Sequence, residues 1–174
     1  MSDNASSADN QQERLPELTP DYVVGLIDGE GYFSVSVSRD LSKTYKSLRV
    51  RLVFGVDLSE KDGQILYRLR DFFDCGALSR KIDERPSFSN QLRYQVKNYP
   101  DIKGKIIPFF QEHPLLFESK RTAFERFVDI AHRFEAKHHL TDKGFEEMKV
   151  LARAVHGRIL RDYTPVSAKT RMKI

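Results

Sequence analysis

The chain has 174 residues, of which 40% are hydrophobic and 31% charged, as is typical of one soluble globular domain. It contains no apolar run long enough to cross a bilayer and no secretory signal, so we expect an intracellular protein without a membrane partner. One cysteine excludes an internal disulfide framework, and a net charge of +4 permits nucleic-acid binding without requiring it.

The two ends of the chain differ in composition from the middle. Residues 1–17 are mostly polar and are expected to form a disordered leader, and residues 164–174 are expected to form a basic tail. A single folded domain is expected over residues 18–163.

The first part of this domain predicts a helix and a long β-hairpin. A helix should begin at Thr19, because threonine followed by proline is typical of a helix start. Gly29 and Gly31 should end it. Strict alternation of apolar and polar residues over 32–38, and again over 47–56, then predicts two strands with one apolar face.

The second part continues with a helix and two more strands and then becomes helical. Apolar residues at helical spacing predict a helix from about Lys61, and a strand should follow the Cys75–Gly76 turn. A fourth strand is predicted around 93–97, and helices from 102–110 onward, with an interruption at Pro108. The order indicates an α+β fold: an αββαββα core whose four-stranded antiparallel sheet is covered by helices on one face, plus C-terminal helices.

The outward positions of the predicted sheet are rich in basic and polar side chains. A solvated face without a partner would mix charges of both signs, whereas carboxylates are nearly absent here. Arg, Lys, Gln and Ser side chains also reach the base edges and phosphates of DNA. We therefore predict a DNA-binding face, with an ordinary basic surface as the alternative interpretation. The predicted contact residues are Ser34, Ser36, Ser38, Arg39, Lys43, Lys46, Ser47, Arg49, Arg51, Ser79, Lys81, Arg93, Gln95 and Lys97.

The first predicted helix conflicts with ordinary helix design. Gly25 and Gly29 each lower helix propensity by about 1 kcal/mol relative to Ala, and their spacing leaves one face open to close approach by another backbone. Asp28 and Glu30 lie at the C-terminal end, where the helix dipole disfavours anions. Conflicts of this kind indicate a functional site, and carboxylates suit Mg²⁺. The alternative is a glycine-capped helix with two solvated acids.

The segment Val23–Gly31, V-V-G-L-I-D-G-E-G, resembles the signature motif of the LAGLIDADG homing endonucleases. The resemblance includes the element order, the Cys75–Gly76 turn and a Pro-Leu-Leu-x-x-x-Lys stretch over 114–120. It implies an intron-encoded, site-specific endonuclease that cuts both strands of a long, roughly palindromic DNA target. The implied cofactor is Mg²⁺, which Mn²⁺ or Ca²⁺ can replace for binding.

The presence of one motif implies a homodimer joined through the motif helix. By this resemblance the interface contains Val24, Gly25, Asp28 and Gly29. Asp28, the first acid of the motif, is expected to be structural, either as a cap or across the interface.

The resemblance also assigns roles near the predicted metal. Glu30 matches the catalytic acid that binds the metal, and the Gly29 carbonyl would complete the coordination. Lys120 resembles a lysine that stabilises phosphate charge or polarises water, with Arg121 as the competing choice. Asp57 is the candidate for a polar residue that orders active-site water after the second strand.

Two other classes of function stay open at this point. The first is a non-cleaving nucleic-acid binder on the same scaffold, such as an RNA splicing maturase, and the second is a structural protein that shares only the fold. Glu30 favours the nuclease, and the basic outward positions argue against a structural role. The sequence has no zinc-binding histidine spacing and no glycine-rich phosphate loop after a strand, so no small-molecule cofactor is expected. The compartment is expected to be the cytoplasm or nucleoid, or an organelle matrix.

Overall fold

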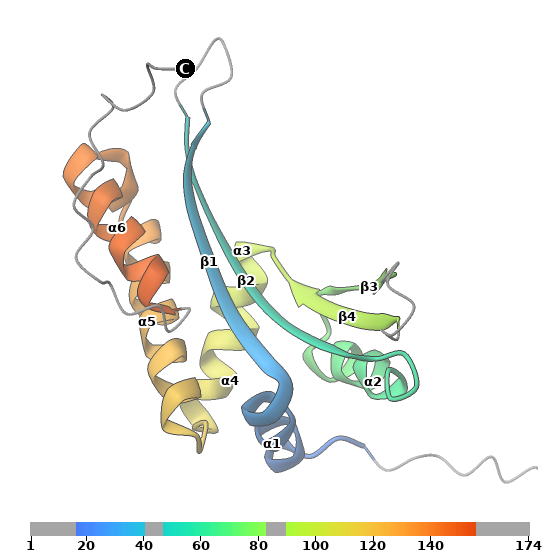
Figure 1. The fold of residues 1–174 in the computed structure, drawn as a ribbon. Helices are drawn as coiled ribbons and strands as arrows, with labels where there is room; N and C mark the ends of the chain where they lie inside the picture. Colours follow the sequence, from blue (N-terminus) through green and yellow to red (C-terminus); the bar gives the residue numbers. More distant parts are fainter. Residues whose placement is uncertain (1–16, 41–46, 83–89, 156–174) are drawn as a thin grey trace, which may run out of the picture.

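Four antiparallel strands form one curved sheet, and the long helices pack along one side of it (Figure 1). The computed structural model describes residues 17–40, 47–82 and 90–155, in which the strands lie in the order β1-β2-β4-β3. No helix in these three ranges is both long and apolar enough to cross a membrane. The elements are α1 (Pro20–Glu30), β1 (Gly31–Asp40), β2 (Ser47–Ser59), α2 (Gln64–Phe73), β3 (Ala77–Lys81), β4 (Gln91–Val96), α3 (Tyr99–Asp101), η1 (Ile102–Ile106), α4 (Ile107–Glu112), α5 (Glu118–Glu135), η2 (His138–Leu140) and α6 (Asp142–Val155).

Helix α1 begins and ends as the sequence predicts. The Thr19 side chain caps it by accepting a hydrogen bond from the backbone N–H of Tyr22 at 3.3 Å. Gly31 follows directly after the last helical residue and starts β1 in an extended conformation. A Cβ at Gly31 would lie 2.5 Å from Cγ2 of Ile27, so glycine is needed here for close approach and not for an unusual backbone angle.

The predicted hairpin is confirmed, with its apolar and polar faces as expected. β1 pairs with β2 in antiparallel register from Gly31 opposite Val56 to Asp40 opposite Ser47. Phe33 on β1 and Phe54 on β2 face each other across this register and are both buried on the covered face. Alternation along each strand therefore leaves the polar set on the open, concave side of the sheet in Figure 1.

The following elements agree with the prediction apart from their ends. A turn over residues 60–63 precedes α2, which therefore begins at Gln64 and not at Lys61. Gly76 adopts a positive φ of 83°, which explains why a glycine precedes β3. β4 ends at Val96, so the predicted contact residue Lys97 lies one residue beyond the strand.

The predicted interruption at Pro108 is wrong. The chain stays helical through Pro108, because a π-helical turn over Ile102–Ile106 comes directly before it. In that turn the N–H of Ile107 donates to the carbonyl of Ile102, five residues back. Proline lacks an N–H and its ring crowds the preceding turn, and a wider turn accommodates both without ending the helix.

An aromatic cluster joins the sheet to the helices. The ring of Phe33 on β1 has its centroid 5.3–5.7 Å from those of Phe54 on β2, Phe110 on α4, and Phe124 and Phe127 on α5. These tilted and edge-on contacts suit the quadrupoles of aromatic rings. The cluster fixes α5 against the hairpin, and α5 carries the predicted active-site lysine.

Several predictions lie outside the described residues. They are the leader over residues 1–16, the tail over 164–174, the last part of the expected domain over 156–163, the contact residues Lys43 and Lys46, and the side chains of Arg39 and Ser47.

We expect Phe33→Ala to lower the free energy of unfolding by about 3–5 kcal/mol, because it removes the ring that contacts four others and leaves a cavity. Urea denaturation followed by circular dichroism measures the loss. Val150→Ala, at a side chain that is 45% exposed on α6, should change it by less than about 0.5 kcal/mol. Equal effects of the two substitutions would contradict the central place of Phe33.

Candidate active site and nucleic-acid interface

Glu30 lies at the junction between α1 and the sheet. It is the last residue of α1, its side chain is exposed, and the next residue, Gly31, is already part of β1. The backbone carbonyls of the last helical turn, including that of Gly29, have no partner within an α-helix. The junction thus offers one carboxylate and nearby carbonyl oxygens, which are the hard ligands that Mg²⁺ prefers.

Asp28 points in the opposite direction, into the protein. Its side chain is only 4% exposed, and its carboxylate accepts hydrogen bonds from the backbone N–H groups of Leu116 at 2.8 Å and Phe117 at 3.2 Å. Phe117 is the N-cap residue of α5. The motif's first acid therefore ties the end of α1 to the start of α5, as the capping interpretation expects.

Lys120 reaches the same junction from the first turn of α5. Its ammonium group donates a hydrogen bond to the carbonyl oxygen of Gly31, next to Glu30 in the chain. The competing candidate, Arg121, lies next to it in α5 with its side chain exposed. Of the two, the structure brings Lys120 to the candidate site.

The two faces of α1 differ sharply. The side chains of Val24 and Asp28 are buried within the chain, whereas Gly25 and Gly29 are exposed, and a Cβ at either glycine would meet no atom within 4 Å. The open side of the predicted interface therefore consists of the two glycines. Sequence reasoning missed large exposed apolar side chains in and beside this region, which are Tyr22 (52% exposed), Leu116 (75%) and Phe117 (58%).

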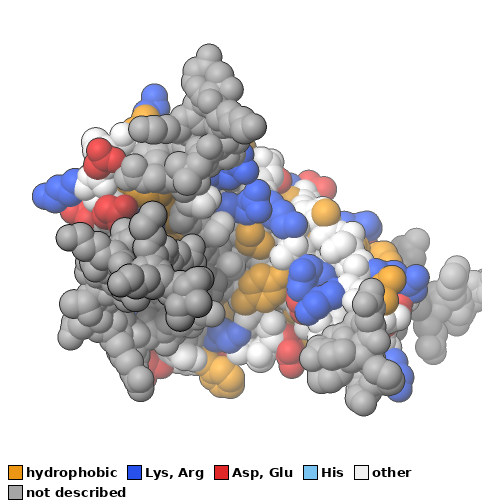
Figure 2. Space-filling model, turned by 45° about the horizontal axis from the view of Figure 1, so that its top comes forward, with side chains coloured by type: hydrophobic (Ala, Val, Ile, Leu, Met, Phe, Trp, Pro, Cys, Tyr) orange, Lys and Arg blue, Asp and Glu red, His pale blue; other side chains and the backbone are white. Residues whose placement is uncertain are grey.

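The open face of the sheet carries the predicted contact residues. Cross-strand pairs place Ser36 opposite Arg51 and Ser38 opposite Arg49, toward the end of the hairpin that is distant from Glu30. In Figure 2, Lys and Arg side chains gather over the middle of the molecule with few acidic side chains among them. The exposed members of the predicted set are Ser36, Ser38, Arg49, Arg51, Ser79, Lys81 and Lys97, whereas Ser34, Arg93 and Gln95 are half-buried.

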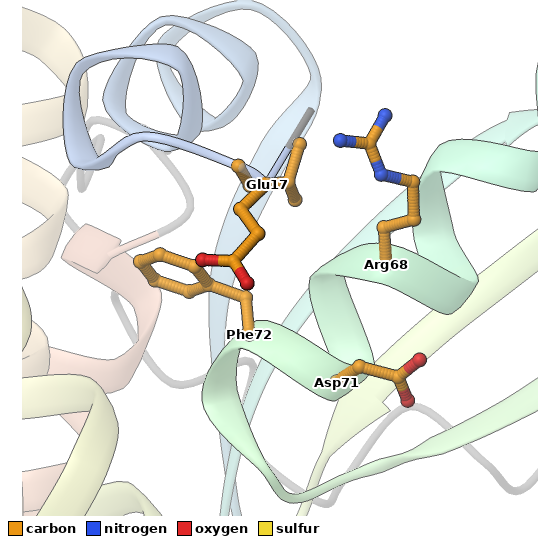
Figure 3. Close-up of a pocket in the computed structure, with 5 residues that line it drawn as sticks. Glu17, Arg68, Asp71 and Phe72 are labelled. Carbon is orange, nitrogen blue, oxygen red and sulfur yellow. The ribbon is translucent and has the colours of Figure 1, made fainter. Parts of the chain in front are cut away.

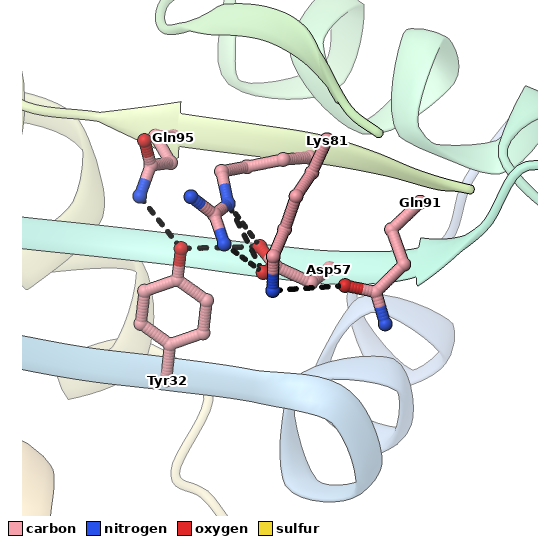
Figure 4. A network of polar contacts seen from close by, with 6 residues as sticks. Tyr32, Asp57, Lys81, Gln91 and Gln95 are labelled. Atoms are coloured by element: carbon pink, nitrogen blue, oxygen red, sulfur yellow. Dashed lines mark hydrogen bonds and ion pairs between the residues drawn. The ribbon is translucent and has the colours of Figure 1, made fainter. Parts of the chain in front are cut away.

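Two of the half-buried members, Arg93 and Gln95, belong to a polar network near Glu30 (Figure 4). Arg93 donates to both carboxylate oxygens of Asp57, Gln95 donates to the Tyr32 hydroxyl at 2.7 Å, and that hydroxyl donates to Asp57 at 3.2 Å. Burial raises the pKa of Tyr32, and the hydrogen bond to Asp57 raises the pKa of Arg93, so the phenol stays protonated and the guanidinium charged. A further contact joins Lys81 to Gln91 at 3.4 Å.

Tyr32 was not among the predicted site residues, although the sequence contains an indirect signal for it. Gly55 lies opposite Tyr32 in the middle of a long strand, where glycine is unfavourable. A Cβ at Gly55 would lie 2.6 Å from the Tyr32 hydroxyl oxygen, so the glycine leaves room for the phenol to cross β2.

Of the residues that the structure describes, Glu30 is the exposed carboxylate at the α1–β1 junction. Among the described residues, no group of three or more His, Cys, Asp and Glu side chains could hold a metal ion. The donor types at the α1–β1 junction, one carboxylate and backbone carbonyls, fit Mg²⁺.

A separate groove lies at the opposite end of α1 (Figure 3). It has a volume of about 460 Å³ and is lined by Glu17, Leu18, Arg68, Asp71 and Phe72. Because Leu18 precedes the N-terminus of α1 and Glu30 ends the helix, this groove lies away from the candidate metal ligands.

The profile of the family described as LAGLIDADG endonuclease matches residues 23–131, more than half of the chain. The chain belongs to the LAGLIDADG endonuclease family. Its fold is similar to that of the homing endonuclease I-TnaI, with 32% identity and a TM-score of 0.69 over 80% of this chain and 88% of that one. It is also similar to I-SmaMI bound to an uncleaved DNA target in the presence of calcium ions, with 26% identity, a TM-score of 0.71, and coverage of 83% of this chain and 47% of that one.

Relatives known from sequence include longer proteins. Homing endonuclease I-ApeII of Aeropyrum pernix is 31% identical over 117 residues, which is 65% of this chain and 62% of I-ApeII. A probable intron-encoded DNA endonuclease of Mycosarcoma maydis is 34% identical over 98 residues, or 55% of this chain and 31% of that protein. An uncharacterized 50.9 kDa protein in ND4 intron 1 of Podospora anserina is 28% identical over 130 residues, or 73% of this chain and 27% of its own length. The chain thus spans about a quarter to a third of the last two proteins.

We expect Asp28→Ala to lower the free energy of unfolding by about 3 kcal/mol, because it removes a buried carboxylate and leaves two part-buried backbone N–H groups without their acceptor. Chemical denaturation measures this loss. The matched control is Asp62→Ala, at an exposed position before α2, which should change stability by less than about 0.5 kcal/mol. A small effect at Asp28 would show that the start of α5 is held by other contacts.

Proposed function

We propose that the protein is a site-specific endonuclease that cleaves both strands of a long DNA target, as an intron-encoded homing endonuclease does. The observation that carries the proposal is the junction at which the exposed Glu30 carboxylate and the Lys120 ammonium group lie at the base of a polar, basic sheet face. Hydrolysis of a phosphodiester requires stabilisation of negative charge on the phosphate, and both groups can serve that need.

Homodimerisation through α1 is part of the proposal. The chain matches 88% of the I-TnaI chain but only 47% of the I-SmaMI chain, so it corresponds to about half of the larger protein. The exposed glycines of α1 allow another backbone to approach closely, and the exposed Tyr22, Leu116 and Phe117 supply apolar area near them. Two copies would bring together two Glu30 carboxylates, one for each DNA strand.

The proposed metal is Mg²⁺, held by Glu30 and the Gly29 carbonyl together with DNA phosphate oxygens; Mn²⁺ or Ca²⁺ would replace it in binding. When bound, a divalent ion activates water and stabilises the charge on the leaving oxygen. The contribution of Lys120 is a fixed positive charge, because its bond to Gly31 holds the ammonium group at the junction. Asp57 is a less suitable water-ordering residue, since its oxygens already accept from Arg93 and Tyr32.

The sheet face supports recognition of a long, roughly palindromic duplex. β2 has 13 residues and extends over roughly 40 Å, enough to follow a major groove across one half-site. Its arginines and the exposed lysines should make binding strongly dependent on salt, because each neutralised phosphate releases counterions. Such a protein works inside the compartment that holds its target DNA, either the cytoplasm or an organelle matrix.

We expect Glu30→Gln to bind target DNA with nearly unchanged affinity and to cleave it at least about a hundredfold more slowly, because the amide keeps the shape but not the charge that holds the metal. The assay is Mg²⁺-dependent cleavage of a randomised palindromic duplex library, with EDTA as a blank and sequencing of the cut ends. Asp21→Asn, at the exposed start of the same helix, should cleave like the unmodified protein. Retained cleavage by Glu30→Gln would refute the metal-ligand role, whereas binding without cleavage by the unmodified protein would favour the inactive binder or maturase.

Gly25→Leu should weaken the dimer about tenfold to a hundredfold, because a side chain forced into a close helix contact costs about 1–3 kcal/mol. The monomer should remain folded, since the added Cβ meets no atom within 4 Å and leucine favours helix. Sedimentation equilibrium measures the dissociation constant. Gly104→Leu is the matched control, at another helical glycine with open space around it. A dimer that tolerates leucine at 25 would exclude α1 from the contact.

A further inference from the structure

Asp57 places a carboxylate within a sheet face whose described side chains are mostly basic or uncharged. Asp57 on β2 lies directly opposite Arg93 on β4, and the Arg93 Nε is 2.9 Å and 3.0 Å from its two oxygens, with Nη2 donating as well. The two side chains are only 21% and 29% exposed. A bidentate, half-buried pair of this kind fixes the plane of the guanidinium far better than an exposed ion pair does.

Neighbouring residues hold the carboxylate in turn. The Tyr32 hydroxyl has one proton, which goes to Asp57, so its oxygen accepts from the Gln95 amide. Gly55 leaves the space that the phenol needs, because a Cβ there would lie 2.6 Å from the Tyr32 hydroxyl oxygen. Three strands thus contribute to one connected arrangement around Asp57 (Figure 4).

Asp57 holds the Arg93 guanidinium in place but engages only part of its hydrogen-bond donors. Asp57 occupies the edge formed by Nε and Nη2, whereas the Nη1 donors make no contact with Asp57. An arginine presents five N–H donors, so its outer edge can still donate to a planar pair of acceptors. In the major groove of DNA, O6 and N7 of guanine form such a pair.

We propose that Asp57 is a positioning residue that holds Arg93 to donate hydrogen bonds to a guanine in the major groove, at one base pair in each half-site. This inference rests on the proposed DNA-binding function of the sheet. It gives Asp57 a role in base recognition in place of the ordering of active-site water. Because a preset guanidinium loses less conformational freedom on binding, the pair raises both affinity and selectivity for that base pair.

The negative charge of Asp57 should couple its effect on DNA binding to that of Arg93. Paired with Arg93, the carboxylate adds little negative potential to a face that meets phosphates. Without Arg93 it becomes an unpaired anion beside DNA, and its repulsion adds to the loss of the guanine contact. Removal of Asp57 as well should then restore part of the affinity, which independent contact residues would not do.

The test is a double-mutant cycle on the duplex that the unmodified protein selects from a randomised library, with Ca²⁺ present to prevent cleavage. We expect Arg93→Ala to weaken binding about 30-fold, and Asp57→Ala about fivefold with reduced preference for guanine at one base pair per half-site. The double variant should bind several-fold more tightly than Arg93→Ala alone, since residues in direct contact are coupled. Asp57→Asn, which keeps one acceptor oxygen, should fall between the unmodified protein and Asp57→Ala.

The matched control is the cycle of Glu60→Ala and Arg80→Ala. These residues form another carboxylate–arginine pair, but Arg80 alternates with Ser79 and Lys81 on β3 and so lies on the other face. Their effects on DNA binding should be small and additive. Additive losses at Asp57 and Arg93, or an unchanged base preference in Asp57→Ala, would overturn the inference and leave the endonuclease proposal intact. An unmodified protein that selects no duplex would overturn both.

Discussion

The buried carboxylate of Asp28 is the constraint on which the candidate site depends. Glu30 and Lys120 are separated by nearly ninety residues, yet they meet at one helix–strand junction. The hydrogen bonds from Leu116 and Phe117 to Asp28 fix the first turn of α5 beside the last turn of α1. The aromatic cluster around Phe33 holds the rest of α5 against the sheet, but it cannot set the start of the helix with the same accuracy. A directional, charge-assisted contact can do so.

The two faces of α1 have different surroundings. Its inner face carries Val23, Ile27 and Asp28, which are buried in the chain, and its outer face carries Gly25 and Gly29, which contact nothing within it. Glycine inside a helix lowers stability, and neither glycine is needed to avoid a clash within the chain. The proposed dimer accounts for both glycines, because two copies of α1 could then pack closely and each would supply one Glu30 carboxylate.

The parts of the fold that follow from local pattern could be predicted from the sequence. Alternation gave both faces of the hairpin, and Thr19 and Gly31 marked the two ends of α1. Features that depend on distant pairing could not be predicted. The partners of Tyr32 lie 25 and 63 residues away, and they are known only when the strand register is known. Pro108 was misinterpreted because a π-turn lies directly before it, and residue type alone does not indicate such a turn.

The sheet face is not a uniform basic surface, and the difference along it bears on recognition. Toward the end of the hairpin distant from Glu30, exposed serines lie opposite exposed arginines. The long arginine side chains can adapt to several base pairs. Near Glu30, the half-buried network around Asp57 offers donors in fixed directions and nearly balanced charge. A side chain held in a fixed position discriminates strongly between base pairs, because a wrong base leaves its donors unpaired. A flexible side chain rearranges to meet other bases. Under the proposed function, selectivity should therefore be strictest at the base pairs that lie next to Glu30.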